Sequence, residues 1–357
     1  MDFDYHYSSK LLIFSKKIMR QLILSAAVVL LAVTFGESQE KYEHHSSYKI
    51  DPSGTVYLDC EDAEVYIKSG SQDEVVVDVI RQVSGELVKR PFDIDYKSEN
   101  GHFYMTEKKS TGLVFSWSGG TIVKYTIELT IPYGASLNII GEDDDYYIDN
   151  LGGDIELQAE DGTVRITACT SKKMAFQLED GDVILKQVGA DLRAELEDGD
   201  VICYESNLGN VEIEIEDGDV TFSESSARDI NIKSSDGDVN LDKVDGDVTI
   251  ETDDGDISID ELRSYYADLK TTDGDIIAHL VTKNEGSHKL SSEDGDIALR
   301  ISGAGAQIEI DIEDGDVSAN SNYDYLKKKE HYKMLHTRPS GQTKVQISTI
   351  DGDVRLK

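Results

Sequence analysis

Residues 236–262 read DGDVNLDKVDGDVTIETDDGDISIDEL, three copies of an Asp-Gly-Asp motif in succession. The same signature recurs along the chain, with a second Asp after the Gly in every copy but the first. Most steps between copies are 18 to 21 residues, so the repeating unit is about nineteen residues. Within the quoted stretch the copies are only nine residues apart, which indicates a half-unit. The last step is close to two units and indicates a turn that has lost its signature. Asp-Gly begins at residues 161, 180, 198, 217, 236, 245, 254, 273, 294, 314 and 351.

Apolar residues fall into three columns when the copies are aligned on the first Asp. They lie three residues after it, as at Val183, five residues after it, as at Leu185, and four residues before it, as at Phe176. The copy at 245 adds Val248 and Ile250 to the first two columns. Apolar residues two apart are typical of a strand with one buried side. Two such strands per unit bury one continuous core if the coils stack, so we predict an all-β fold, a parallel β-solenoid of about nineteen-residue coils.

An antiparallel meander of hairpins is the alternative fold, because Asp-Gly is also a favoured hairpin turn. One set of turn residues at a fixed coil length favours the solenoid, since stacking requires the same turn on every coil. The Gly is expected to supply the positive φ of the turn. Its flanking Asp side chains are expected to accept hydrogen bonds from nearby backbone N–H groups.

The repeats have different neighbours on each side. Residues 39–140 carry strand-like runs without the fixed unit, and we predict an irregular β cap there that covers the first coil, because a bare end exposes unpaired backbone groups. Residues 141–319 form the predicted solenoid, and residues 320–357 hold a Lys-rich insertion and a terminal coil. We expect Asn320–Lys344 to be a loop folded over the final coil, with a partner-binding loop as the alternative.

The first segment is an export signal by composition. Residues 22–35 read LILSAAVVLLAVTF, with basic residues before them and Gly-Glu-Ser after them. A membrane-spanning helix needs about 17–25 apolar residues, so a cleaved signal over residues 1–38 is favoured over an uncleaved anchor. Met19 begins a tidier signal than Met1 and is a second candidate for the true start. The mature chain is expected in the periplasm or at the cell surface or beyond it, without crossing the membrane.

The EDGDV and SDGDV ladder is led by LTIPYGASLNIIGEDDDYYIDNLGGDIEL at residues 129–157. These motifs resemble the bacterial putative-adhesin family, exported proteins of β-strand repeats with a domain of unknown function. The resemblance covers about residues 48–357. It implies a β-solenoid at the cell envelope with an adhesive or scaffolding role. It implies no catalytic residues, because the family has no established set, and the Lys-rich insertion lies outside its repeat pattern.

The charge excludes several classes of partner. The chain has 71 Asp and Glu against 35 Lys and Arg, a net charge of −36. Nucleic acid and anionic lipid are therefore not expected partners, because both would be repelled. The excess belongs to residues 141–319, with 48 acidic against 13 basic residues. Cys60, Cys169 and Cys203 lack metal-ligand spacing, and we predict small core residues rather than a zinc site.

The turn aspartates would form columns if the coils stack, and like charges about 5 Å apart repel one another. Solvent and salt can absorb this repulsion, some carboxyl pKa values can rise, or cations can bridge adjacent coils. Calcium suits the third outcome because it accepts six to eight oxygen ligands in loose geometry. The simpler interpretation is that these residues only shape turns and keep the surface soluble, since the turn lacks the longer glycine-rich motif of calcium-binding β-rolls. The candidate calcium ligands are Asp180, Asp182, Asp198, Asp200, Asp217, Asp219, Asp236, Asp238, Asp254, Asp256, Asp273, Asp275, Asp294 and Asp296.

Nothing in the sequence points to catalysis. Among 71 acids some carboxyl pairs lie at catalytic distances by chance, and the eight histidines show no metal or triad spacing. We therefore predict that the chain is not an enzyme and has no catalytic residues, and no cofactor other than the calcium considered above.

The predicted function is display. We expect an exported adhesin-like or scaffolding β-solenoid that presents repetitive acidic faces at the bacterial cell envelope. Recognition would use outward ladders such as Thr249, Ser258 and Ser318, with an unknown envelope or surface protein or polysaccharide as partner. The alternative is a structural module stabilised by calcium at the stacked turns. A carbohydrate-active envelope enzyme is the remote alternative.

Overall fold

A computed structural model describes residues 39–84, 92–108 and 121–357. The predicted export signal lies outside these residues. No helix in the described part of the chain is long and apolar enough to cross a membrane.

The chain divides into two units. Of the first, only the ends of three strands are described. The second comprises residues 42–81, 90–112 and 124–357, and it contains the features discussed below.

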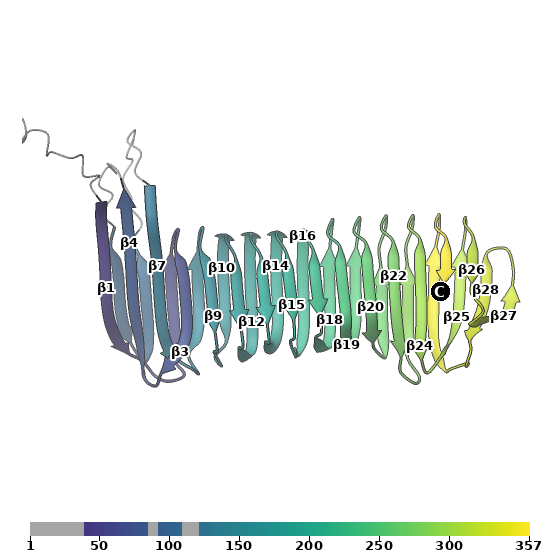
Figure 1. The fold of residues 1–357 in the computed structure, drawn as a ribbon, viewed down its shortest axis with the longest axis horizontal. Coiled ribbons are helices and arrows are strands. Elements are labelled where there is room, and N and C mark those ends of the chain that lie inside the picture. The colour runs from purple at the N-terminus through teal and green to yellow at the C-terminus, as the bar shows by residue number, and fades with distance from the viewer. Residues whose placement is uncertain (1–38, 85–91, 109–120) are drawn as a thin grey trace, which may run out of the picture. The chain divides into compact units, whose positions relative to one another are not determined.

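Thirty strands and no helix are present in the described ranges (Figure 1). The strands of the N-terminal region are β1 (Gln39–Lys49), β2 (Thr55–Cys60), β3 (Glu64–Ser71), β4 (Glu74–Ser84), β5 (Ile94–Glu99), β6 (His102–Glu107) and β7 (Thr121–Pro132).

From β8 onward all strands except β27 and β28 form two parallel ladders, and each strand of a repeat pairs with the matching strand of its neighbours. Ladder A contains β8 (Ser136–Gly141), β10 (Ile155–Asp161), β12 (Thr170–Asp180), β14 (Gly189–Asp198), β16 (Asn210–Asp217), β18 (Ser226–Ser234), β21 (Tyr266–Lys270), β23 (Ser287–Ser291), β25 (Ala306–Ile312) and β29 (Thr343–Thr349). Ladder B contains β9 (Asp145–Asp149), β11 (Val164–Thr167), β13 (Val183–Lys186), β15 (Val201–Tyr204), β17 (Val220–Ser223), β20 (Ile257–Arg263), β22 (Ile276–Thr282), β24 (Ile297–Gly303), β26 (Val317–Ala319) and β30 (Val354–Leu356).

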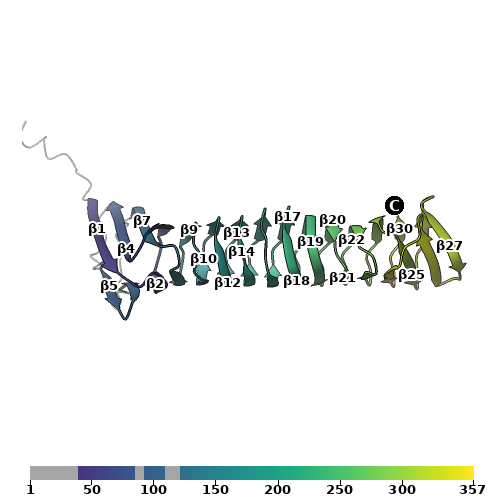
Figure 2. The same cartoon turned by 90° about the horizontal axis from the view of Figure 1, so that it is seen from below.

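The parallel β-solenoid is confirmed, and the antiparallel meander is excluded for the repeats. Phe176 of β12 pairs in parallel with Leu157 on one side and Ala194 on the other. Each repeat therefore forms one rung, a strand of ladder A and a strand of ladder B, and equivalent residues of successive rungs pair with each other. The inward side chains are buried on most rungs of both ladders, as at Leu157 of ladder A and Val183 of ladder B, which are 0% exposed. Those of β26, Val317 and Ala319, are half-buried. Figure 2 shows the two strands of each rung from a second direction. Alternation of apolar and polar residues therefore gives the strands of each rung one buried face and one solvent-exposed face.

The half-repeat is explained by β19 (Val239–Thr252), which continues from ladder B into ladder A. Its central Asp-Gly-Asp at 245 lies at the connection opposite the other copies, where Asp245 pairs with Ser226. The column assignment of Val248 and Ile250 is therefore wrong. Both residues belong to ladder A, where they pair with Ile230 and Ile232.

All Asp-Gly-Asp or Asp-Gly turns except the copy at 245 lie in one column, which we call the turn column. Their glycines are required because the backbone of each rung passes very close to the backbone of the next. A Cβ on Gly255 would overlap the carbonyl oxygen of Gly237, and the same conflict recurs at every rung of the column. The expectation that these glycines supply a positive φ holds at four positions only. Those four are Gly162, Gly199, Gly218 and Gly315. Lack of space for a Cβ, rather than backbone handedness, is thus the constraint that all copies share.

The C-terminal rung is inserted out of sequence order. Strand β29 pairs in parallel with both β23 and β25, and β30 pairs with both β24 and β26. The yellow final strands accordingly lie among the green strands in Figure 1. The long step between Asp-Gly motifs is therefore not a lost turn. After β24 the chain leaves one rung position empty, forms the next rung with β25 and β26, and then returns to fill the empty position with β29 and β30.

The Lys-rich insertion forms a hairpin of β27 (Tyr323–Lys328) and β28 (Tyr332–Thr337). Strand β28 pairs antiparallel with β25 and covers its free edge. This hairpin is the cover that we expected over the final coil. The coil that it covers is β25–β26, which lies at the end of the stack, and not β29–β30, which comes last in the sequence. The N-terminal region has a similar arrangement, since β2 lies between β6 and β8, and β3 lies between β7 and β9.

We predict that Gly255→Ala lowers the free energy of unfolding by about 1–3 kcal/mol, because the new methyl group must displace the Gly237 carbonyl. The matched control is Gly189→Ala at the opposite turn, where a Cβ would be 3.4 Å from the nearest atom, the carbonyl oxygen of Asn207. The control should change stability by less than about 0.5 kcal/mol. Denaturant unfolding followed by circular dichroism measures both. Equal effects of the two substitutions would contradict the proposed crowding of the column.

Candidate binding faces

The second Asp of each turn motif is a structural hydrogen-bond acceptor. Asp238 Oδ1 accepts the backbone N–H of Asp256 at 2.8 Å, and the N–H of Asp238 itself donates to Asp219 Oδ1 at 3.0 Å. Bonds of this kind, 2.7–3.0 Å long, connect each rung to the next. The acceptors are Asp182, Asp200, Asp219, Asp238, Asp256, Asp275, Asp296 and Asp353. The predicted acceptance of backbone N–H groups by turn aspartates is confirmed for the second Asp of the motif, and the donors lie on the neighbouring rung.

The first Asp of each motif forms a separate column that faces solvent. Asp198 pairs with Asp180 and Asp217 in the ladder register. Local desolvation and then the charges of these two neighbours raise the pKa of the Asp198 carboxyl above its usual range. The same causes, with Asp143 in place of Asp217, raise the pKa of Asp161. The pKa is therefore raised at Asp161 and Asp198, one of the outcomes expected for stacked carboxylates.

The calcium candidates are accordingly divided between two columns with different roles. Those in the second-Asp column already accept a backbone N–H, whereas those in the first-Asp column are exposed to solvent. In the described ranges no group of three or more His, Cys, Asp or Glu side chains has metal-binding geometry. Calcium binding stays a prediction.

Face A is the solvent side of ladder A, and it carries a long groove beside the turn column. The groove has a volume of about 800 Å³ and extends over the strands from β8 to β18. Its polar lining consists of two in-register rows of outward side chains with one cation, Lys233. The glutamates of these rows are Glu160, Glu179, Glu195, Glu197, Glu214 and Glu216.

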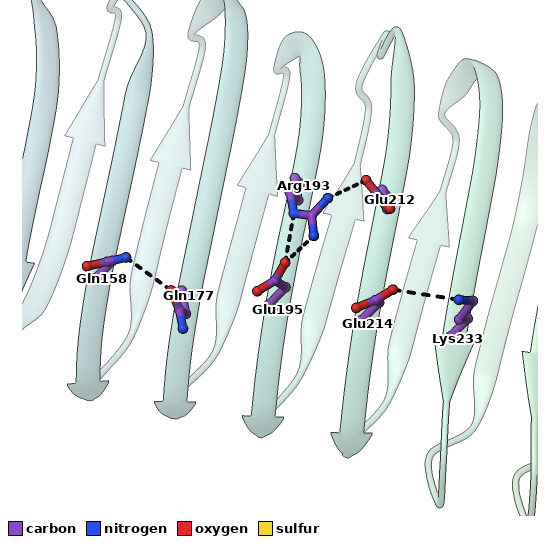
Figure 3. Close-up of polar contacts among 7 residues, drawn as sticks. All are labelled: Gln158, Gln177, Arg193, Glu195, Glu212, Glu214 and Lys233. Carbon is purple, nitrogen blue, oxygen red and sulfur yellow. Dashed lines mark hydrogen bonds and ion pairs between the residues drawn. The ribbon is translucent and has the colours of Figure 1, made fainter.

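Side chains on face A connect neighbouring rungs, as Figure 3 shows. Gln158 Nε2 donates to Gln177 Oε1 at 3.0 Å. The Arg193 guanidinium donates to Glu195 Oε1 at 2.7 Å on its own strand and to Glu212 Oε2 at 2.7 Å on the next. These exposed pairs contribute little stability individually, because solvent screens them. They do hold the outward groups in fixed positions along the ladder.

Face B is the solvent side of ladder B, and its central row carries no carboxylate. The row is acid-free over twelve rungs, in contrast to face A and to the rows that flank it. We call it the acid-free row. Its members are Tyr66, Tyr147, Arg165, Ile184, Ile202, Thr221, Asn240, Ser258, Ile277, Ala298, Arg355 and Ser318.

The predicted recognition ladder is only partly brought together. Ser258 and Ser318 both lie in the acid-free row, but Thr249 lies on face A, paired with Asn231 and Asp268. The error follows from the turn at 245, which the repeat alignment treated like the others. The residue between the two apolar columns is the signal that could have revealed the acid-free row.

One buried and one half-buried carboxyl, those of Asp144 and Glu107, lie in polar clusters near the N-terminal rungs. Asp144 is 1% exposed and accepts the Ala63 N–H at 2.6 Å and the Tyr146 hydroxyl at 3.1 Å. Burial raises the pKa of Asp144 to about 6, with these hydrogen bonds opposing the shift. Glu107 accepts the Tyr125 hydroxyl at 2.8 Å, and burial raises its pKa to about 7. Both carboxyls lie outside the groove on face A.

The cysteines are buried and free, as the sequence analysis predicted for core residues. Burial raises the pKa of Cys169 and of Cys203 to about 11, and the pKa of Cys60 is also well above its usual range. Such thiols are unreactive at neutral pH.

His288 occupies an aliphatic column of ladder A between Ala267 and Val345. It is 1% exposed, and neither ring nitrogen has a hydrogen-bond partner within the described ranges. Burial lowers the pKa of His288 to about 4, with a small opposing effect of Asp247. The imidazole is therefore neutral at pH 7, directly beneath the inserted rung. The sequence offered no signal for this residue beyond its place in an apolar column.

The Toastrack DUF4097 family model matches residues 55–261 and, in a second overlapping match, residues 190–357. The chain belongs to the Toastrack DUF4097 family. The resemblance drawn from the DGD ladder is thereby confirmed. No curated protein matches this toastrack chain significantly.

Several solved structures match the chain at low sequence identity and low TM-score. A putative adhesin of Parabacteroides distasonis is 14% identical, with 73% of this chain and 94% of that chain covered and a TM-score of 0.33. A putative adhesin of Bacteroides fragilis is 11% identical, with 89% and 98% covered and a TM-score of 0.24. A putative lipid binding protein of P. distasonis is 11% identical, with 90% and 98% covered and a TM-score of 0.37.

We predict that the toastrack solenoid loses up to about 3 kcal/mol of stability through His288 as pH falls from about 6.5 to about 4. The folded pKa is below the ordinary value of 6.5, so the unfolded chain binds a proton there that the folded chain does not. His288→Leu should remove this loss, as measured by denaturant unfolding at several pH values.

The comparison of His288→Leu with wild type isolates the histidine from the buried carboxyls. Asp144 and Glu107 act in the opposite direction, because their raised pKa values make the folded chain bind protons first as pH falls. Equal acid sensitivity of wild type and variant would show that His288 is not buried as a neutral group.

Proposed function

We propose that this chain is an exported, non-catalytic adhesin-like scaffold of the bacterial cell envelope. It binds an extended envelope or surface polymer, protein or polysaccharide, along face A. The observation that carries the proposal is the groove of about 800 Å³, whose outward rows stay in register over successive rungs. The apolar leader at residues 22–35 supports export.

The repeat spacing suits many weak contacts in series. Neighbouring rungs are about 4.8 Å apart, so a partner laid along the groove meets an equivalent pair of side chains at each step. Once one contact forms, the next is intramolecular, and affinity increases with the number of rungs engaged. Binding of this kind needs a rigid array rather than one deep pocket. The cross-rung bonds of Arg193 and Gln158 support such rigidity.

The positions of the acidic groups favour binding over catalysis. A general acid needs a pKa close to neutrality and access to substrate. The carboxyls with the most strongly raised pKa values, Asp144 and Glu107, are hydrogen-bonded to tyrosines away from the groove. They are more simply explained as structural groups of the N-terminal rungs.

A calcium-stabilised structural module is the second candidate function. The in-register stacking of Asp198 between Asp180 and Asp217 favours it, because a cation between adjacent rungs would relieve the repulsion between their carboxylates. A rise of thermal midpoint at millimolar calcium, absent with magnesium, would distinguish this module from a metal-independent scaffold.

We predict that the exported chain co-sediments saturably with envelope fragments of the cells that produce it. Replacing three groove glutamates by lysine (Glu195, Glu214 and Glu216) should weaken binding by about tenfold or more, since it reverses the charge at neighbouring rungs. The matched control replaces Asp236, Asp254 and Asp273 of the turn column by lysine, with the same change of net charge. Absence of saturable binding would overturn the function, and equal loss in both triple variants would remove the groove as its site.

A further inference from the structure

We infer that the acid-free row of face B is the contact surface for a second copy of this chain. The two copies lie side by side, related by a twofold axis parallel to the row. This pairing is independent of the binding proposed for face A, which stays open to solvent in the pair.

The charge of the chain leaves few surfaces where two copies can meet. Each copy has a net charge of −36, so most surfaces of two copies repel each other at short range. At physiological ionic strength screening acts over about 8 Å, so the local charge of a face decides whether it can be buried. The acid-free row combines two arginines with neutral residues. It is therefore the outward row with the lowest electrostatic cost of contact.

The N-terminal half of the row has the composition of an interface core. Tyr66 and Tyr147 stack with ring centroids 4.7 Å apart and planes 9° apart. Ile184 and Ile202 continue the row on the next rungs, half-buried and without a covering element. The Arg165 guanidinium lies 5.6 Å from the centre of the Tyr147 ring. Aromatic residues and arginine are enriched at interface cores, and acidic residues are depleted there.

A shallow pocket lies at the start of the row. It has a volume of about 470 Å³, and Tyr66, Tyr147 and Arg165 of the row line it. Its other polar lining residues are Lys68, Thr167, Glu128 and Asp149, so two carboxylates lie at its edge. A flat β face with one such depression accepts another side-chain-covered face better than it encloses a small molecule. Sheets that pack face to face lie about 10 Å apart, which these half-buried side chains can span.

The flanking rows decide the orientation of the second copy. On the rung of β13, Asp182 precedes Ile184 by two residues and Lys186 follows it by two, so the acid and the base lie on opposite sides of the row. A twofold axis along the row places Lys186 of each copy opposite Asp182 of the other on the same rung. An axis across the row would instead set Lys186 rows against each other and aspartate columns against each other. Charge complementarity over the rungs from β13 to β17 therefore favours the axis along the row. On three other rungs the same axis sets carboxylates against carboxylates, since Asp145, Asp238 and Asp256 would face Asp149, Asp242 and Asp260.

The same axis supplies hydroxyl groups on the next two rungs. Tyr204 would face the second copy's Asp200, and Ser223 would face its Asp219, because each pair flanks the row symmetrically. The carboxylates concerned already accept one backbone N–H each and have a free oxygen for a further donor. The pairing therefore needs no rearrangement of the turn column.

Sedimentation equilibrium of the exported chain over a concentration series tests the proposal. We predict a reversible dimer, and Ile184→Asp with Ile202→Asp should weaken it by about tenfold or more. The matched control, Gln158→Asp with Gln177→Asp, adds the same charge to face A and should leave the dimer intact. A monomeric wild-type chain, or equal loss in both double variants, would overturn the proposal.

Cysteine cross-linking tests the axis even if the aspartate variants unfold. Facing sheets lie about 10 Å apart, which is too far for a disulfide, so a short bis-maleimide is the cross-linker used. Ile184→Cys and Ile202→Cys should each be cross-linked to the same residue of the second copy, because every residue of the row lies near its own symmetry mate. Gln177→Cys should not, and the three native cysteines are buried. Cross-links at only one of the two positions would contradict an axis along the row, and none at either would contradict the contact. Envelope binding by the cross-linked dimer tests the proposed function of face A separately from the pairing through face B.

Discussion

The close approach of each turn glycine to the carbonyl of the neighbouring rung is the constraint on which the other features depend. A rung can lie in register with the next only if its backbone turns without a Cβ at this point, as Gly255 does against Gly237. The following aspartate then lies where its carboxylate accepts the next rung's N–H. Stacking in register aligns the inward Val and Ile residues into one core. It also aligns the outward residues into rows, which are the surfaces that any partner would meet.

The ends of the stack solve a separate problem. A solenoid end offers unpaired backbone groups, and a terminal rung held by a single neighbour opens easily. Here the last two strands, β29 and β30, lie between rungs that precede them in sequence, so the C-terminal rung has a neighbour on both sides. The hairpin β27–β28 then covers β25. His288 pairs with Val345 of this inserted rung, so a neutral buried imidazole lies where the order of the C-terminal rungs departs from sequence.

The sequence predicted the repeat length, the parallel stacking and most core columns, because turn crowding and strand alternation are local and recur at every rung. The prediction failed where the two opposite turns of a coil require the same residues. Gly246 meets the Ala227 carbonyl at the opposite turn much as Gly255 meets Gly237, so the same motif serves both connections. That ambiguity misplaced Val248 and Thr249. The inserted terminal rung escaped prediction for a related reason, since a rung has the same pattern wherever it lies in the stack. The difference in charge between face A and face B depends on which residues share a row. It becomes visible only when each Asp-Gly-Asp copy is assigned to the correct one of the two turns.

Hydrogen–deuterium exchange at single-residue resolution tests in-register stacking most directly. The backbone N–H groups of Asp200, Asp219 and Asp256 belong to solvent-facing turns, and only a carboxylate one rung away protects them. The account predicts exchange slowed by about a hundredfold or more relative to an unstructured peptide. It predicts the same for Asp353 and Asp316, whose bonds exist only if the terminal rung is inserted. Exchange of these amides at unstructured rates, while the core amides stay protected, would contradict it.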